Sequence, residues 1–335
     1  MKRIVFFLCV LCLFFTNISG QYMPDYLGEG YACRVFQMPD DYDGKVVTTL
    51  IKKKQHPAKE KAFLYVHGYN DYFFQTELAD SVEAHGYNFY ALDLRKYGRS
   101  LLAEQDTFFV KDIKEYYADL DTAIYTILQE GNKDIVLMGH STGGLITSLY
   151  LNDRGGEVPV KALILNSPFL DMNMSWVLEN IGVPLVSFIG KYFPYLEVQG
   201  RGLSMYAESL LKQYHGEWDY NTDWKLVYGH PIKAGWIRAI HQAHNRVQDG
   251  LNIQVPVLLM SSDQSIKEKK TWNEDYRRAD IVLDVEDIQK YGRRLGAQVT
   301  PVTVAGGIHD LVLSLPTVRG VVYNVMFDWI DKNVQ

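Results

Sequence analysis

The sequence predicts an α/β fold in which a mostly parallel central sheet is covered by helices on both faces. Three observations support this class. Short apolar runs alternate with amphipathic segments in both halves of the chain, which is the order of βαβ units. The apolar runs are nearly unbroken, as expected of strands buried on both faces. Several of them end in loops that carry glycine, histidine or aspartate, where open α/β sheets bind ligands.

The expected strands and helices follow from hydrophobic periodicity and turn signals. Strands are expected over residues 31–37, 45–51, 62–66, 88–92, 135–138, 161–165, 255–260 and 298–304, and helices over 75–84, 110–128, 285–295 and 318–330, with another beginning near 145. The first two strands form a hairpin around Asp43 and Gly44.

The alternation stops between residues 169 and 249, where helical pieces rich in Trp, Tyr and Met show no convincing strand. We interpret residues 169–250 as a helical cap inserted between strands. The α/β core then comprises residues 21–168 and 251–335, and a single capped domain fits better than two independent ones.

The composition is that of a globular protein with a large core. Of its 335 residues, 47% are hydrophobic and 22% charged, and the formal net charge of −6 offers no attraction to nucleic acid. No nucleotide-binding loop or flavin motif is found, so we expect no cofactor. His241 and His244 lie three apart without a third ligand nearby, so we expect no metal site either.

Residues 1–20 have the layout of a secretory signal peptide. Two basic residues precede an apolar run over residues 4–15, and a polar stretch follows. The run is shorter than the roughly twenty residues that a spanning helix needs. We expect an exported protein, periplasmic or secreted; because Ile18 fits the cleavage site poorly, an uncleaved membrane anchor is the alternative. Removal of the leader leaves Cys33 as the single cysteine.

The run from Gly139 to Gly143 fits GxSxG and follows the apolar strand over 135–138. This motif places a serine on a sharp turn between a strand and a helix, with its hydroxyl exposed above the sheet. The apolar residues after Gly144 continue at helical spacing, as the motif requires. Ser141 is therefore the expected nucleophile; the alternative is a tight turn whose serine only caps the helix.

Acyl transfer also requires a base, a carboxylate that orients the base, and donors for the oxyanion. His309 lies in a glycine-rich turn after the last strand and is the expected base. His67 and His140 come too early for that role and are expected to be structural. The backbone amides of Tyr69 and Thr142 are the expected oxyanion donors.

These residues carry a resemblance to the α/β-hydrolase superfamily, and within it to the monoacylglycerol lipase and lysophospholipase branch, which is grouped with the serine aminopeptidases (S33). The motifs that match are His67-Gly68, the stretch over 93–100, the elbow over 139–144, Ser167-Pro168 and the turn over 307–310. The resemblance spans about residues 62–330, with a divergent cap, and it implies the α/β-hydrolase fold and a serine triad.

The sequence departs from the family pattern at the acid. Asp263 follows the strand too early by two positions, and a polar insertion over residues 264–279 comes next. Measured back from the following helix, Asp280 occupies the position that the resemblance assigns to the acid. We favour Asp280, with Asp263 as the alternative and Asp284 as a cap of the helix.

The resemblance implies a serine hydrolase that cleaves carboxylic esters of hydrophobic acyl chains, such as monoacylglycerols or lysophospholipids, through an acyl-enzyme. The expected partner is a small or lipid-like ester, with proximity to a membrane surface. An aminopeptidase or amidase is the alternative and would need an acidic pair, for which Glu208 and Glu217 are available. A less favoured alternative is an exported binding protein whose triad has decayed.

Overall fold

The computed structural model describes residues 20–54 and 59–334, so the expected signal peptide lies outside the described residues except for Gly20. One nine-stranded sheet has the order β1-β2-β3-β5-β4-β6-β7-β10-β11. Its strands are β1 (Met23–Asp25), β2 (Gly28–Asp41), β3 (Gly44–Lys53), β4 (Lys61–Val66), β5 (Asn88–Asp93), β6 (Asp134–His140), β7 (Val160–Asn166), β10 (Val257–Ser262) and β11 (Val299–Val304). Every expected strand is present, and within this sheet the short β1 is the one strand that was not expected.

The sheet is antiparallel at one end and parallel elsewhere. Strands β1, β2 and β3 pair antiparallel, as do β3 and β5, whereas the pairs from β5 to β11 are parallel. The predicted hairpin turns at Gly44, whose φ of 95° favours glycine. In β4, Phe63 and Tyr65 join one hydrophobic cluster while Leu64 and Val66 join the other, so this strand is buried on both faces.

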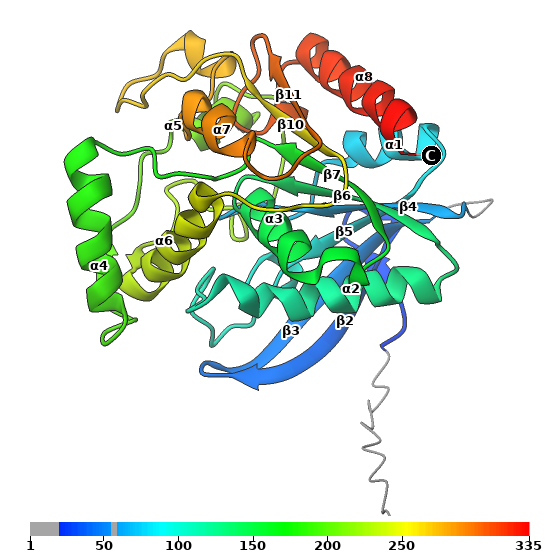
Figure 1. Ribbon diagram of the computed structural model, residues 1–335, viewed down its shortest axis with the longest axis horizontal. Coiled ribbons are helices and arrows are strands. Elements are labelled where there is room, and N and C mark those ends of the chain that lie inside the picture. Colours follow the sequence, from blue (N-terminus) through cyan, green and yellow to red (C-terminus); the bar gives the residue numbers. More distant parts are fainter. Residues whose placement is uncertain (1–19, 55–58, 335) are drawn as a thin grey trace, which may run out of the picture.

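Helices cover both faces of the sheet (Figure 1). One face is covered by α1 (Thr76–Ala84) and α8 (Pro316–Asn333), and the other by α2 (Tyr117–Gln129), α3 (Thr142–Arg154) and α7 (Val285–Gly292). The predicted helix over 110–128 begins with a 3₁₀ turn, Ile113–Tyr116, which Asp112 caps through its side chain. The mostly parallel, doubly covered sheet confirms the predicted fold class.

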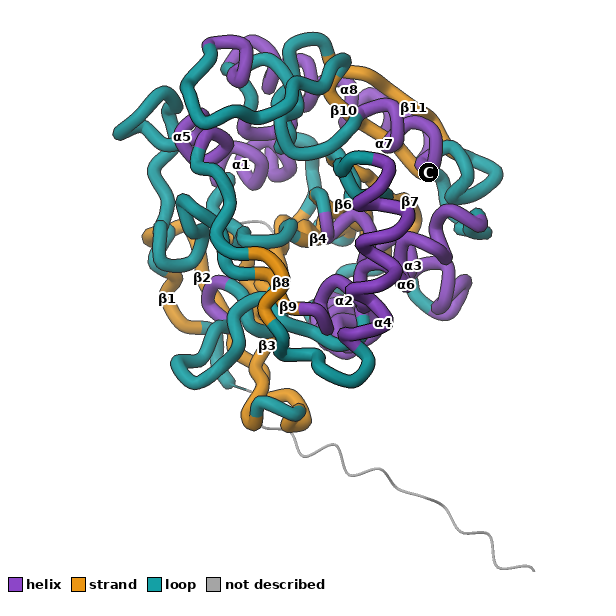
Figure 2. Tube along the Cα trace, turned by 90° about the vertical axis from the view of Figure 1, so that its left-hand side faces the viewer, coloured by secondary structure: helices purple, strands orange, loops and turns teal. Residues whose placement is uncertain are grey.

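Between β7 and β10 the chain leaves the sheet and forms the cap. Its helices are α4 (Val183–Gly190), α5 (Met205–Leu210) and α6 (Ala234–Asp249). Strands β8 (Glu197–Gln199) and β9 (Ile232–Lys233) pair antiparallel, so the expectation of a cap without strands is wrong here. Strands this short carry no period-two pattern that could reveal them. Figure 2 faces the cap and shows that much of it is loop.

The cap and the core share one hydrophobic cluster. Ile240 and Val247 of α6 are fully buried in the cluster that also contains residues of α2 and α3. Among residues 20–54 and 59–334, no helix is both long enough and apolar enough to cross a membrane.

Candidate active site

Ser141 lies in the turn between β6 and α3, at the carboxyl end of the sheet. Its φ of 51° and ψ of −118° form a backbone conformation that residues other than glycine rarely adopt. The Ser141 N–H donates to the carbonyl of Asn166 on β7 at 3.1 Å. A Cβ added to Gly143 would overlap the carbonyl oxygens of His67 and Val66, which explains the glycine. The strained turn therefore holds the serine hydroxyl at a fixed place above the sheet.

His309 joins this serine to a buried carboxylate. Its Nε2 atom lies 3.0 Å from Ser141 Oγ, and its Nδ1 atom lies 2.9 Å from Asp280 Oδ2. The other oxygen of Asp280 accepts the backbone N–H groups of Val282 and Leu283, both at 2.8 Å. Because the carboxylate can only accept, Nδ1 of His309 carries the proton and Nε2 is left to accept the serine proton.

The insertion over residues 264–279 forms a loop whose two ends meet. The N–H of Asp280 donates to the carbonyl of Gln264 at 3.0 Å, and the N–H of Ile266 donates to the carbonyl of Asp280 at 2.9 Å. The insertion therefore leaves the sheet and returns to almost the same place. This path brings Asp280 into the site in spite of its distance from β10 along the chain.

The other two candidate acids have different contacts. Asp263 is exposed and accepts the N–H of Gly306 at 3.0 Å. Asp284 caps α7 by accepting a backbone N–H in its first turn, as predicted. The structure thus places Asp280, and neither of the alternatives, against His309.

The predicted oxyanion donors border the same cavity as the serine. Thr142 is the first residue of α3, where backbone N–H groups have no partner within the helix. A Cβ added to Gly68 would lie 2.9 Å from the Cβ of Ser141, so the loop that carries Tyr69 passes directly beside the nucleophile. In the described part of the chain, neither the N–H of Tyr69 nor that of Thr142 has a protein acceptor, so both are available to an oxyanion.

His67 and His140 are buried and hold the backbone, as expected. His67 accepts the N–H of Leu94 at Nε2 (3.1 Å), and its Nδ1 lies 2.8 Å from the carbonyl of Gly68. The Nδ1 of His140 lies 3.1 Å from the carbonyl of Asn166. Burial lowers the pKa of both rings, so both are neutral at pH 7.

Asp71, His140 and Asp310 each offer a potential metal-ligand atom, and the three atoms lie within 4.8 Å of one another. Asp71 Oδ1 lies 2.8 Å from the buried ammonium of Lys225, and the carboxylate of Asp310 accepts two side-chain amide N–H groups. The ammonium and the two amides thus serve three of the four carboxylate oxygens, and the buried Oδ2 atom of Asp71 has no hydrogen-bond partner in the described part of the chain. The ammonium of Lys225 supplies a positive charge at this cluster.

A cavity of about 330 Å³ lies above Ser141, between the core and the cap. Its walls are mostly apolar and aromatic, with a few polar groups, which is typical of small-molecule sites. From the cap the cavity is lined by Phe169, Leu203, Tyr206, Leu226, Val227, Tyr228, Ile232 and Trp236, and from the core by Tyr69, Asp71, Thr142, Val282, Leu283 and His309.

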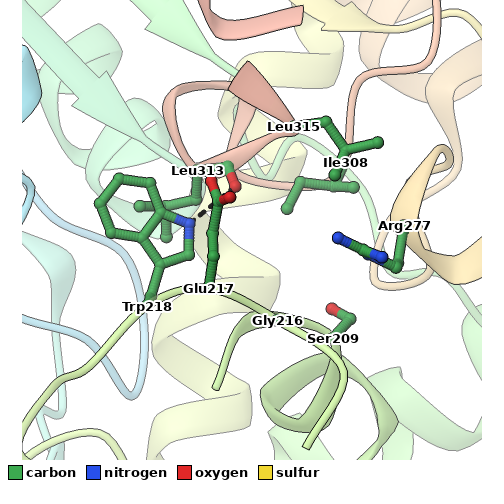
Figure 3. Close-up of a pocket in the computed structure, with 8 residues that line it drawn as sticks. All are labelled: Ser209, Gly216, Glu217, Trp218, Arg277, Ile308, Leu313 and Leu315. Carbon is green, nitrogen blue, oxygen red and sulfur yellow. Dashed lines mark hydrogen bonds between the residues drawn. The ribbon is translucent and has the colours of Figure 1, made fainter. Parts of the chain in front are cut away.

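A second cavity, of about 10 Å³, lies where the cap meets the loop after His309 (Figure 3). Trp218 Nε1 donates to the carbonyl of Leu313 across this contact at 2.9 Å, the dashed line in Figure 3. The space is about that of one water molecule, and Ser141 does not line it. It belongs to the packing of the cap and not to the chemistry.

The polar groups of the main cavity that were not anticipated from the sequence are Asn70, Asp71, Gln199, Lys225, His230 and Glu268. Asp71 and Lys225 are 154 residues apart, and no local pattern announces such a pair. Glu268 belongs to the insertion and accepts the N–H of Met205 at 2.9 Å. Burial raises its pKa above the usual range.

The class of protein follows from the site and the sheet. A serine on a strained strand-to-helix turn is bonded through a histidine to a buried carboxylate, at the carboxyl edge of a mostly parallel sheet. The protein is an α/β hydrolase. Residues 57–314 match the family described as Serine aminopeptidase, S33 (Hydrolase_4), and the chain belongs to this family. The resemblance inferred from the motifs is thereby confirmed.

Solved structures of lipases and esterases share the fold. A soluble variant of the monoglyceride lipase of Saccharomyces cerevisiae, in complex with a substrate analog, is similar at 17% identity and a TM-score of 0.63, over 94% of this chain and 95% of that one. The Paleococcus ferrophilus monoacylglycerol lipase is similar at 18% identity and a TM-score of 0.58, over 82% and 96%. A carboxyl esterase from Bacillus coagulans, in complex with glycerol, is similar at 13% identity and a TM-score of 0.62, over 90% and 99%. No protein of curated function matches the chain.

Proposed function

We propose that this protein is a serine ester hydrolase that cleaves carboxylic esters of hydrophobic acyl chains through an acyl-enzyme intermediate. The observation that carries the proposal is the hydrogen-bonded series Ser141, His309 and Asp280 at the floor of a largely apolar cavity. Monoacylglycerols and lysophospholipids are the substrate class that we favour.

The reaction follows from the contacts of the site. Ser141 Oγ attacks the ester carbonyl while His309 Nε2 takes its proton, and Asp280 stabilises the resulting imidazolium. The N–H groups of Tyr69 and Thr142 bind the oxyanion. Collapse breaks the bond to the leaving alcohol, which receives the proton from His309. Water, activated by the same histidine, then attacks the acyl-enzyme, and the acid and the free serine are released.

Graded acyl esters test the proposal. We expect turnover of p-nitrophenyl esters to rise with acyl length until the cavity of about 330 Å³ is filled, because each buried methylene adds binding energy. Monoacylglycerols and lysophospholipids would then be compared at the preferred length. Failure of the purified protein to hydrolyse any ester, or equal turnover by Ser141→Ala, would refute the proposal.

Amide hydrolysis is the second candidate, favoured by the family to which the chain belongs. The expected acidic pair is not at the cavity: Glu208 bonds the hydroxyl of Ser204 at 2.6 Å, and Glu217 pairs with Arg319. Asp71 and Glu268 both line the cavity, and because Asp71 is paired with Lys225, Glu268 is the carboxylate available to a substrate amine. Turnover of aminoacyl amides above that of fatty esters, lost in Glu268→Gln, would favour this activity. The contact between Asp280 and His309 weighs against a binding protein whose triad has decayed.

The cap supports our proposal that the enzyme works close to a membrane surface. Helix α4 packs on α6 at the outside of the cap (Figure 1), and its neighbourhood exposes large apolar side chains, including Trp176 (69% exposed), Phe188 (61%) and Phe193 (67%). We expect sedimentation with phosphatidylcholine vesicles and a weaker association when these three are replaced by serine. Equal sedimentation of both proteins would count against this surface.

We also propose that residues 1–20 direct export. Cys33 suits an oxidising compartment, because burial raises the pKa of its thiol to about 11 and keeps it unreactive. Cell fractionation and the mass of the mature chain test this proposal: loss of the first twenty or so residues supports a cleaved signal peptide. An intact chain in the membrane fraction would favour an anchor, and an intact chain in the cytosol would contradict export.

A further inference from the structure

The loop that carries the Tyr69 amide has two halves with different supports. The half next to β4 is held by the core through His67, whose Nε2 accepts the N–H of Leu94 and whose Nδ1 lies 2.8 Å from the carbonyl of Gly68. The half after Tyr69, residues 70–72, is held by the cap. The Tyr69 amide, which would bind the oxyanion, therefore lies between a segment held by the core and a segment held by the cap.

The cap support is one short segment, residues 221–226, which we call the cap clasp. Asn70 makes two hydrogen bonds with the backbone of Leu226: its Nδ2 donates to the carbonyl and its Oδ1 accepts the N–H, both at 2.8 Å. Asp71 Oδ1 lies 2.8 Å from Lys225 Nζ. The hydroxyl of Tyr72 accepts the N–H of Asn221 at 2.7 Å. Three consecutive residues after the oxyanion residue are thus bonded to the clasp.

These contacts fix a loop conformation that would otherwise be unfavourable. Asn70 has a φ of 51°, in the left-handed region that asparagine tolerates better than most residues. Lys225 and Asp71 are 5% and 1% exposed, so removing either partner would leave a buried charge without compensation. The pairing of Asn70 and Asp71 with the clasp therefore determines where the chain leaves Tyr69.

The clasp also faces the substrate cavity. Lys225 and Leu226 line the cavity above Ser141, as do Val227 and Tyr228, which follow directly. The Tyr69 ring packs against Trp236 of the cap, with ring centroids 4.6 Å apart. Because the cap contacts both the Tyr69 ring and the residues after Tyr69, the position of the cap affects the position of the Tyr69 amide on the core side of the cavity.

We propose that Asn70 and Asp71 are positioning residues of the oxyanion hole. Through the clasp they aim the N–H of Tyr69 at the reacting carbonyl when the cap is seated on the core. The inference rests on the proposed ester hydrolysis, and it adds that the cap takes part in stabilising the transition state as well as in enclosing the substrate.

The first test is Asn70→Gly, which removes both bonds to Leu226 and keeps a residue that tolerates positive φ. We expect kcat to fall about ten- to a hundredfold with KM within about threefold, because the oxyanion donor is displaced while the cavity loses only the Asn70 side chain from its lining. Affinity for a fatty trifluoromethyl ketone, which needs the oxyanion donors, should fall in proportion to kcat. Affinity for a fatty alcohol of the same length should not change.

A matched pair of double variants is the second test. Asp71→Asn with Lys225→Met removes the ion pair at the oxyanion loop and leaves no unpaired charge. Asp106→Asn with Lys233→Met removes another ion pair between the core and the cap, one that does not touch the oxyanion loop. We expect a loss of kcat of roughly tenfold for the first and less than about twofold for the second.

The outcomes separate the two proposals. Wild-type protein that hydrolyses no ester overturns the proposed function, and this inference with it. Wild-type turnover together with unchanged kcat in Asn70→Gly, or equal losses in the two double variants, overturns the inference alone. Should Asn70→Gly not fold, Asn70→Asp, which keeps the acceptor for the Leu226 N–H and loses the donor, replaces it: an unchanged kcat in that variant also overturns the inference.

Discussion

Replacing Asp280 with asparagine tests the assignment of the acid, and the structure specifies the outcome. One carboxylate oxygen accepts two backbone N–H groups, from Val282 and Leu283, and the other accepts the Nδ1–H of His309. An asparagine keeps one acceptor oxygen, which we expect to accept the two backbone N–H groups. Its NH₂ group then faces His309 Nδ1 and forces the proton onto Nε2, which can no longer accept the proton of Ser141.

This change of tautomer should lower kcat about ten-thousandfold, or roughly 5 kcal/mol of transition-state stabilisation, the size seen when a serine triad carries the wrong tautomer. The assay is the steady-state hydrolysis of a p-nitrophenyl ester, with thermal unfolding to verify the fold. Asp263→Asn is the matched control, because Asp263 is exposed and accepts the N–H of Gly306 instead of contacting His309. Near-normal turnover by Asp280→Asn, with a large loss in Asp263→Asn, would refute the reasoning.

Two further predictions concern stability. Burial lowers the pKa of His244 to about 3, whereas the ring in the unfolded chain titrates near 6.5. The free energy of unfolding should therefore fall as the pH drops below about 6.5. In urea titrations, His244→Gln should reduce the loss of unfolding free energy between pH 7.5 and pH 5 by about 2 kcal/mol. An unchanged pH dependence would contradict this source of acid sensitivity. A Cβ at Gly143 would overlap two backbone carbonyls, so Gly143→Ala should lose about 2 kcal/mol of stability together with the activity. Gly156→Ala is the control: a Cβ at Gly156 would have no atom within 4 Å, so this variant should change neither stability nor activity. Equal melting temperatures of the two variants would show that the turn tolerates the methyl group.

Local signals identified much of the core from the sequence. The turn at Ser141 has the positive φ that GxSxG implies, and the hairpin at Gly44 formed where its turn residues placed it. His309 lies in the loop after β11 that the order of the triad residues indicates. Each of these features depends on a few consecutive residues, so the sequence alone carries enough information.

Long-range contacts could not be predicted in the same way. The insertion displaced Asp280 along the chain, and the meeting of Gln264 and Ile266 with Asp280 brings the acid back to the site. The pairing of Asp71 with Lys225 depends on how the cap lies over the core. Hydrophobic periodicity reports which residues are buried and does not report which distant segment buries them.

The central claim is that Ser141 is a nucleophile activated by His309 and Asp280, and labelling with a fluorophosphonate tests it most directly. We predict that the folded protein is phosphonylated on the peptide containing Ser141, that Asp280→Asn reacts orders of magnitude more slowly, and that Ser141→Ala does not react. Peptide mass spectrometry locates the adduct. Folded wild-type protein that resists the probe, or Ser141→Ala labelled at the wild-type rate, would contradict the claim.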